Sequence, residues 1–370
     1  MQKTAVLSRS MEYAKKTEEF HIVVFSLKKH GLYEQKIGNL YLYPTNSMSR
    51  WLYVFDAIRL AKKIIVGNGF VRGASVITCQ DPFECGFAGY KVATYFRLPL
   101  HLQVHTDFQS PYFKISFINR IRVALAKFLV PKAQGLRVVS EIIADSVKKS
   151  FPKIRAHMAV LPVFVDIEAL LEAPVVENMR RDFLPFTFII FMASRLTSEK
   201  RIGTALEVLK KVLNTTKDVG LVIAGDGPER KSLEAHAKTL GLSAHVQCIG
   251  WRENLISYYK TATMFLSTSE YEGYGMSLIE ACACGCPIVT TQVGIAKTDL
   301  FKNGENCFVC AIHDVEGLSN AVLNLIQDHE KRELFKEKMQ ASIRRRAISK
   351  EEYAARYVAL LQELIPPQDI

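Results

Sequence analysis

Short apolar runs alternate with amphipathic stretches along almost the whole chain, and this alternation indicates the fold class. In the first half, the runs that predict strands are residues 21–26, 74–79, 100–104 and 136–139, and the helical patterns between them are residues 11–19, 50–63 and 117–130. β-rich runs separated by helical segments predict parallel sheets covered by helices. We therefore predict an α/β protein.

The alternation starts again after residue 165. The strands predicted there are residues 186–192, 219–224, 246–250, 264–267 and 287–290, and the helices are residues 202–214 and 229–240. A chain of 370 residues exceeds the usual size of a single hydrophobic core. We predict two domains, residues 1–165 and residues 166–347, with the helical stretch in residues 348–370 packing back onto the first.

Charge is divided unevenly between the two halves. Residues 1–165 hold 24 Lys and Arg against 10 Asp and Glu, a net +14, whereas residues 166–370 hold 24 basic and 27 acidic residues, a net −3. A basic half favours an anionic partner, namely lipid headgroups, a lipid-linked phosphate or nucleic acid. Nucleic acid is the least favoured, because the basic half lacks the interleaved aromatic motifs of a known nucleic-acid module.

The segment 113–129 combines basic and apolar residues at helical spacing. Two interpretations remain open: a helix lying on an anionic membrane surface, or a covering helix with an exposed basic face. No apolar run reaches the length of a membrane span, and the polar start has no signal-peptide core behind it. We expect a cytoplasmic protein, peripheral on the inner membrane face, with its eight cysteines reduced.

The clearest chemical signal lies in residues 269–281, SEYEGYGMSLIEA. Gly273 and Gly275 allow a tight turn and a close approach to a ligand, and a helix is expected to start at Gly275 or Met276. The first-turn amides of Met276, Ser277 and Leu278 would then face an anion such as a pyrophosphate.

Two glutamates flank this turn. Glu280 lies about 6 Å further along the helix axis, where a carboxylate suits ribose hydroxyls rather than phosphate. Glu272 precedes the helix and is placed to accept hydrogen bonds from the hydroxyls of a sugar. The spacing is suited to an extended nucleotide-sugar.

This segment resembles the E-x7-E motif of the retaining glycosyltransferases of family 4, which have the GT-B fold. Further matches follow in order: Arg195 and Lys200 resemble the family's diphosphate clamp, Gly225 its strand-end turn, and Trp251 its nucleobase loop. His105, after a first-domain strand, matches the active-site histidine. Residues 301–309 resemble a further family segment, with Cys307 in place of the usual glycine.

The resemblance implies two facing Rossmann-like domains with parallel sheets and an interdomain cleft. It also implies metal-independent, retaining transfer of a hexose from a UDP- or GDP-sugar to a lipid-linked or surface-polysaccharide acceptor, without a cofactor. The catalytic residues would be His105, Glu272, Arg195 and Lys200. The donor would contact these residues, except His105, together with Gly225, Trp251, Gly273, Tyr274, Gly275, Met276, Ser277, Leu278 and Glu280.

The amino terminus departs from the family pattern. Such a domain opens with a strand and a glycine-containing loop, but residues 5–19 read as a helix and the first strand follows at residues 21–26. We expect the opening strand and loop to be missing, and a version extended upstream to be more stable and more active.

Two other functions remain open. One is a different GT-B nucleotide-sugar enzyme, such as an epimerase or a phosphorylase. The other is a donor-binding protein whose catalysis is impaired by the amino-terminal departure. A metal site is not expected: His101 and His105 lie roughly 13 Å apart on a strand, and Cys282, Cys284 and Cys286 lack zinc-ribbon spacing.

Overall fold

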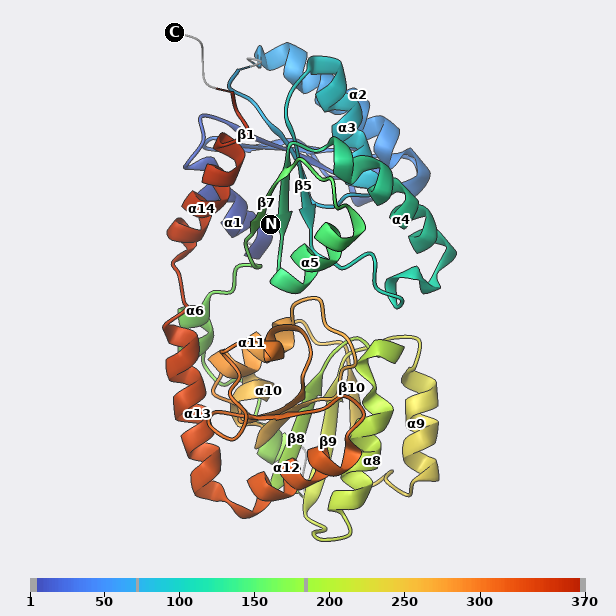
Figure 1. Cartoon of the computed structure of the whole chain (residues 1–370), viewed down its shortest axis with the longest axis vertical. Coiled ribbons are helices and arrows are strands. Elements are labelled where there is room, and N and C mark those ends of the chain that lie inside the picture. The colour runs from blue at the N-terminus through green and yellow to red at the C-terminus, as the bar shows by residue number, and fades with distance from the viewer. Residues whose placement is uncertain (1–4, 71–72, 183–185, 367–370) are drawn as a thin grey trace. The chain divides into compact units, whose positions relative to one another are not determined.

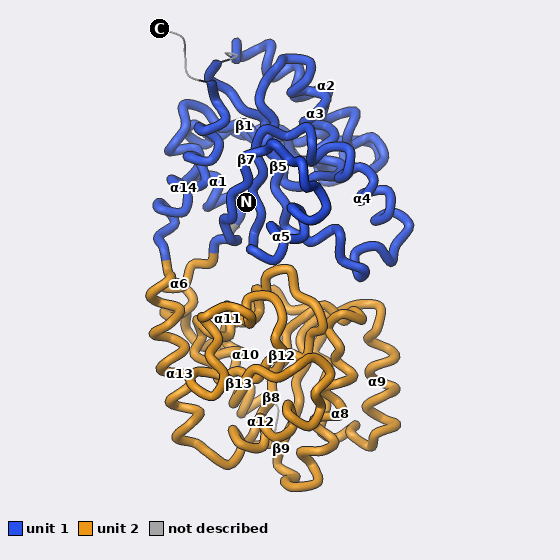
Figure 2. The backbone as a smooth tube through the Cα atoms, in the orientation of Figure 1, with its two compact units in different colours: residues 1–164, 348–370 blue, residues 165–347 orange. Residues whose placement is uncertain are grey.

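The chain folds into two compact units (Figures 1 and 2). This computed structural model describes residues 5–70, 73–182 and 186–366. Unit 1 comprises Met1–Phe164 with Ile348–Ile370, and unit 2 comprises Val165–Ala347. The carboxy-terminal segment thus returns to the unit in which the chain starts.

Unit 2 is built on a parallel sheet whose strand order is β10-β9-β8-β11-β12-β13. The strands are β8 (Phe188–Ala193), β9 (Val219–Ala224), β10 (Val246–Gly250), β11 (Met264–Ser267), β12 (Ile288–Thr291) and β13 (Phe308–Cys310). The helices are α6 (Ile167–Glu172), α7 (Met179–Asp182), α8 (Ile202–Val212), α9 (Arg230–Thr239), α10 (Ile256–Thr261), α11 (Met276–Ala283), α12 (Val315–Gln327) and α13 (His329–Arg344).

Both faces of this sheet are buried, which is why its strands read as continuous apolar runs. Along β8, Ile189 and Phe191 pack into the core beside α10 and α11, whereas Ile190 and Met192 pack into the core beside α8 and α12. Cys282, Cys286 and Cys307 pack into the first of these cores. The eight cysteines, all within the described residues, are free thiols.

The strand order reverses between β8 and β11. From β8 the chain crosses through α8 to β9 on one side, and it later returns to place β11 on the other side of β8. The loops that leave the carboxyl ends of these two strands diverge to opposite sides, and such a switch point is where open parallel sheets bind ligands. The residues of these two loops are therefore the candidates for a site.

Unit 1 contains two sheets. One has the order β1-β3-β2, with β1 and β3 parallel and β2 antiparallel, and the other is parallel with the order β4-β5-β6-β7. The strands are β1 (Phe20–Val24), β2 (Gln35–Ile37), β3 (Leu40–Pro44), β4 (Ile77–Cys79), β5 (Leu100–Val104), β6 (Gly135–Val138) and β7 (His157–Val160). The helices are α1 (Ala5–Ala14), α2 (Tyr53–Asn68), α3 (Glu84–Phe96), α4 (Phe117–Leu129), α5 (Glu141–Ser150) and α14 (Lys350–Gln362).

The predicted elements are largely confirmed, with specific errors that lie mainly in unit 1. The first helix, expected within residues 5–19, is shorter than predicted: α1 covers Ala5–Ala14, so the pattern at residues 11–19 places its end too late. The hairpin of β2 and β3, which turns at a left-handed Gly38, was missed, as were β7 and β13. These strands are short or only partly buried, and they therefore lack the continuous apolar run that marked the others.

A buried guanidinium attaches α14 to unit 1. Arg137 of β6 donates to the carbonyls of Leu161 and Pro162 at 2.9 Å each, to Gln103 Oε1 at 2.6 Å and to Tyr353 Oη at 2.6 Å. Its side chain is only 4% exposed, and these four acceptors are all neutral. The donor-rich head of Arg is thus satisfied by carbonyl and hydroxyl oxygens in place of a carboxylate.

Tyr357, one turn after Tyr353 on α14, extends this network to two strands. Its hydroxyl accepts from Gln103 Nε2 at 2.9 Å and lies 3.1 Å from Thr78 Oγ1. The phenol ring stacks on Tyr13 of α1 with ring centroids 4.4 Å apart. The last helix therefore joins α1 to the parallel sheet of unit 1.

We predict that Arg137→Leu destabilises unit 1 by about 3 kcal/mol or more, because it leaves several buried acceptors without a donor. The check is hydrogen exchange of the β5 and β6 amides in increasing urea, with the β9 amides of unit 2 as the internal reference. The matched control is Arg356→Leu, which removes the same charge from an exposed position of α14 that pairs only with Glu352 across one helical turn. It should cost less than about 0.5 kcal/mol. An equal loss of stability in the two variants would show that the buried network around Arg137 does not stabilise unit 1.

Candidate functional site

The loops after β8 and β11 are held together by backbone contacts. The amide of Glu270 donates to the carbonyl of Glu199 at 2.8 Å. Thr268 Oγ1 donates to the carbonyls of Lys200 and Arg201 at 3.1 and 2.9 Å. The two loops of the switch point are therefore one structural element, although they lie some 70 residues apart in sequence.

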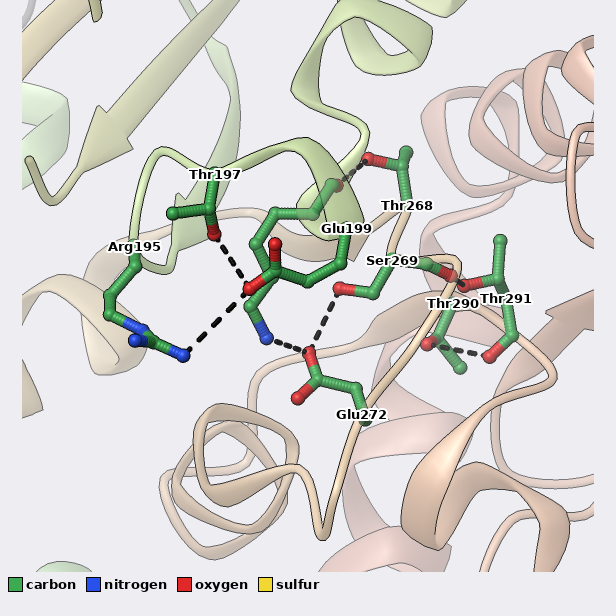
Figure 3. Close-up of polar contacts among 9 residues, drawn as sticks. Arg195, Thr197, Glu199, Thr268, Ser269, Glu272, Thr290 and Thr291 are labelled. Atoms are coloured by element: carbon green, nitrogen blue, oxygen red, sulfur yellow. Dashed lines mark hydrogen bonds and ion pairs between the residues drawn. The ribbon is translucent and has the colours of Figure 1, made fainter. Parts of the chain in front are cut away.

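An ion pair between these loops lies at the centre of the site. Lys200 Nζ donates to Glu272 Oε1 at 2.7 Å, and Ser269 Oγ donates to the same oxygen at 2.9 Å (Figure 3). The Lys200 and Glu272 side chains are 13% and 12% exposed. The structure thus brings together two residues that the sequence assigned to the donor phosphates and the sugar. Ser269, which the sequence argument missed, lies just before Glu272 in the same loop.

Arg195 extends into solvent from the loop after β8. Its side chain is 77% exposed and lies 3.8 Å from a carboxylate oxygen of Glu199, which also accepts from Thr197 Oγ1 at 2.8 Å (Figure 3). The hydroxyl fixes the glutamate, and the glutamate in turn restrains the guanidinium. Glu199 is a second residue that the sequence argument missed.

The helix predicted after the glycine turn is confirmed. α11 begins at Met276, and its N-cap Gly275 has a φ of 106°, a conformation that glycine adopts readily. The Leu278 amide donates to the Gly275 carbonyl at 3.1 Å, and the Leu278 side chain is buried. The Leu278 amide is therefore already hydrogen-bonded, and the first-turn amides that could donate to an anion are those of Met276 and Ser277.

Gly294, a third residue that the sequence argument missed, permits this turn. A Cβ added at Gly294 would lie 2.6 Å from Glu272 Cβ and 2.7 Å from the Tyr274 carbonyl oxygen. The adjacent Ile295 amide donates to that carbonyl at 2.7 Å. The loop after β12 thus packs directly beneath Glu272 and Tyr274, so residue size at position 294 determines where the carboxylate lies.

Glu280 lies one turn into α11 and is mostly buried. Burial raises the pKa of its carboxyl group, and the hydroxyl of Tyr259, which donates to Oε2 at 3.0 Å, acts in the opposite direction. Tyr259 lies on α10 and is itself buried. No sequence spacing links Tyr259 to Glu280, since the pair forms only when α10 and α11 pack together.

Gly225 makes the close contact between the loops after β8 and β9. Its φ is 137°, and an added Cβ would lie 1.8 Å from the Ser194 carbonyl oxygen. Its amide donates to the Gly250 carbonyl at 2.8 Å. The side chain of Trp251, the residue after Gly250, is 71% exposed, which leaves its indole face accessible.

His105 follows β5 in unit 1, and the structure places it at the carboxyl end of that strand. The residue is exposed at the surface, although protein atoms crowd its ring. Desolvation, followed by the charges of Arg137 and Arg9, lowers the pKa of His105 to about 4, so the imidazole is neutral at pH 7. The nearby Asp107 accepts from the Gln109 amide and from Ser146 Oγ, which stabilises the segment after the strand.

Two negative findings hold for the residues that the structure describes. Within them, no three side chains of His, Cys, Asp or Glu come together in a way that could hold a metal ion. No helix in the same part of the chain combines the length and apolarity that crossing a bilayer requires.

Two family models match the chain. Residues 180–342 match glycosyl transferases group 1, and residues 5–169 match glycosyltransferase family 4. The first match covers the ion pair, the glycine turn and Glu280, and the second covers His105.

Among curated proteins, 2-deoxystreptamine N-acetyl-D-glucosaminyltransferase of Niallia circulans is 23% identical over 247 residues, which are 65% of this chain and 63% of that protein. Alpha-monoglucosyldiacylglycerol synthase of Streptococcus pneumoniae is 29% identical over 227 residues, 58% of this chain and 51% of that protein. The matched stretches thus span less than two thirds of either relative.

A solved structure extends the likeness to nearly the whole chain. HepE of Anabaena, in complex with UDP and glucose, superposes with a TM-score of 0.73 at 18% identity, over 98% of this chain and 97% of that one. This likeness confirms the predicted α/β class and the GT-B fold.

We predict that Gly225→Ala destabilises unit 2 by several kcal/mol, because the added Cβ meets a backbone carbonyl oxygen that has little freedom to move. Gly241→Ala is the matched control, since Gly241 also has a positive φ, of 73°, but an added Cβ there would have no atom within 4 Å. It should cost only about 1–2 kcal/mol from backbone strain. Thermal unfolding of both variants checks this, and equal losses would show that the close contact has no effect on stability.

Proposed function

Because the chain belongs to glycosyltransferase family 4 and has the GT-B fold, we propose that it is a retaining enzyme that transfers a hexose from a UDP- or GDP-sugar to a lipid-linked or surface-polysaccharide acceptor. The observation that carries this proposal is the Lys200–Glu272 pair beside the amino end of α11. It combines a cation, a carboxylate and helix amides at the switch point of a parallel sheet. A nucleotide-sugar has a partner for each of these three groups, because it carries phosphates and hydroxyls on one molecule.

In this proposal the donor diphosphate is bound at the amino end of α11. The amides of Met276 and Ser277 would donate to phosphate oxygens, and the helix dipole favours negative charge there. Lys200 and Arg195 would supply positive charge as the nucleoside diphosphate departs, which lowers the barrier to leaving-group release. These groups supply the stabilisation for which other transferases use a divalent ion, so we propose a metal-independent reaction without a cofactor.

Donor binding would exchange the partners of the central ion pair. With no donor bound, Lys200 and Glu272 satisfy each other, which avoids an uncompensated charge at two largely buried positions. A bound donor offers a phosphate oxygen to Lys200 and sugar hydroxyls to Glu272. Each side chain therefore gains a new partner as it loses the old one, and the net cost of opening the pair is small.

The nucleoside would lie further along α11. The Glu280 carboxylate accepts from ribose hydroxyls in this proposal, with Tyr259 fixing its orientation. The exposed indole of Trp251 would contact the base. Stacking on an indole tolerates either base, so UDP and GDP both remain candidates.

Unit 1 would supply the acceptor side. His105 is neutral at pH 7, which suits a hydrogen-bonding role toward a sugar hydroxyl. The net +14 of the first half suits an acceptor that carries phosphate. The similarity to a protein named alpha-monoglucosyldiacylglycerol synthase also supports a lipid-type acceptor.

We predict that the chain binds UDP-glucose or GDP-mannose in the presence of EDTA, and that Glu280→Ala weakens binding of the preferred donor roughly 10- to 100-fold, the usual loss for a hydrogen bond to a charged group. Calorimetric titration measures both. Glu337→Ala, which removes an exposed carboxylate from α13, is the matched control and should bind as the wild type does. An α-linked product from an α-linked donor, identified by NMR, would establish retention.

This proposal is contradicted if the wild-type chain binds neither donor, or if Glu280→Ala binds as tightly as Glu337→Ala. Consumption of the donor without any acceptor, with release of a second nucleotide-sugar, would favour an epimerase. Donor binding without turnover across an acceptor panel would favour a donor-binding protein.

We also predict that donor affinity falls in mild acid and that Tyr259→Phe moves this loss to higher pH. Only ionised Glu280 accepts from both ribose hydroxyls, so affinity is complete above its pKa and falls below it toward the affinity of Glu280→Ala. Removing the Tyr259 hydroxyl removes a hydrogen bond that lowers this pKa, so the pKa rises further. Titrations between neutral and acid pH check this. An identical pH profile for wild type and Tyr259→Phe would show that Tyr259 has no part in positioning Glu280.

A further inference from the structure

Helix α4 exposes a set of large apolar side chains, of which one, Phe128, also packs edge-on against Tyr90 of α3 with ring centroids 5.5 Å apart. Its inward face contacts α3 and buries Val123, Ala126 and Leu129. The residues on its outward face and just before it are large and apolar, and their side chains are 46–74% exposed: Ile115, Phe117, Ile118, Ile121 and Phe128. We call these five residues the α4 apolar face. Isolated exposed apolar side chains are ordinary, but a cluster on one helix is not.

Basic side chains surround this face. Arg120 and Lys127, seven residues apart and hence on one side of the helix, are both exposed, as is Lys132 just beyond its end. Lys132 Nζ lies 4.7 Å from the centre of the Phe128 ring. The sequence has no Asp or Glu between Asp107 and Glu141. Among the described residues, the one ion pair of α4 joins Arg122 to Glu84 of α3 at 2.9 Å, and the exposed Arg120, Lys127 and Lys132 make the surroundings of the face positive.

We propose that α4 docks unit 1 onto an anionic lipid bilayer, with the α4 apolar face inserted among the acyl chains and Arg120, Lys127 and Lys132 at the headgroups. A helix that lies in a bilayer interface has large apolar side chains on one face and Lys or Arg beside them. Lipid phosphates would pair with these three cations. Lys and Arg extend their charged ends away from an apolar surface, so insertion of the face leaves the cations in water.

The composition of the face favours lipid over a protein partner. Protein interfaces have a polar rim that commonly carries both charge signs and draw most of their binding energy from Trp, Tyr and Arg anchors in pockets. The α4 apolar face has no Trp or Tyr among its five residues and is aliphatic apart from its two phenylalanines. The proposal does not depend on the donor chemistry in unit 2. The sequence left open whether residues 113–129 form a membrane helix or a covering helix. In this proposal α4 is both: one face covers unit 1 and the other binds lipid.

Vesicle flotation of the whole chain tests the proposal. We expect binding to vesicles of phosphatidylglycerol and phosphatidylcholine, weakening as salt is raised, and little binding to phosphatidylcholine alone. Phe117→Ser with Ile121→Ser should lower partitioning roughly tenfold or more. Arg120→Gln with Lys127→Gln should also lower it, and should remove most of the salt dependence.

The matched control is Leu334→Ser, which removes an exposed apolar side chain from α13 of unit 2 and should leave vesicle binding unchanged. Thermal unfolding and far-UV circular dichroism must match the wild type in every variant, which shows that the folds are intact. Three results would overturn the proposal: no vesicle binding by the wild type, equal binding by the α4 variants, or a wild-type dimer that these variants dissociate without any vesicle binding. Binding of an oligonucleotide but not of vesicles would overturn it as well.

Discussion

The site depends on one constraint, the contact of the two loops that leave the parallel sheet of unit 2 at its switch point. Lys200 on one loop and Glu272 on the other form a largely buried ion pair at 2.7 Å. The pair requires strands β8 and β11 to be neighbours, the loops to be joined through Glu270 and Thr268, and the glycine turn to bring Glu272 back toward β8. The same turn starts α11, so the cation, the carboxylate and the helix amides are fixed together.

Glycine determines how closely the loops approach. At Gly225 and Gly294 a methyl group would meet a backbone oxygen or the Glu272 side chain. The backbone segments beneath the site therefore pack without intervening side chains. The buried network around Arg137 has a comparable role in unit 1, where neutral oxygens satisfy a cation and attach α14 to the sheet.

Sequence reasoning identified the strands β8 to β12 of unit 2 well because both faces of its sheet are buried. β9, β10 and β11 occupy the predicted residues, and α8 and α9 differ only at their ends. It was less successful in unit 1, where β2 and β3 are half exposed and carry no continuous apolar run. In the site, it could propose residues adjacent to a motif, such as Glu272 and Glu280. It could not propose Tyr259, Glu199 or Gly294, whose positions follow from packing between elements.

The central claim is that the loops at this switch point bind a nucleotide-sugar. Hydrogen–deuterium exchange with and without saturating UDP-glucose or GDP-mannose tests it most directly, because it locates binding along the chain. The account predicts slower exchange at the amides of Met276 and Ser277 and in the loop that contains Arg195 and Lys200, with β13 unchanged. The claim would be contradicted if only other segments were protected from exchange. It would also be contradicted if no segment were protected at a donor concentration that gives a calorimetric signal.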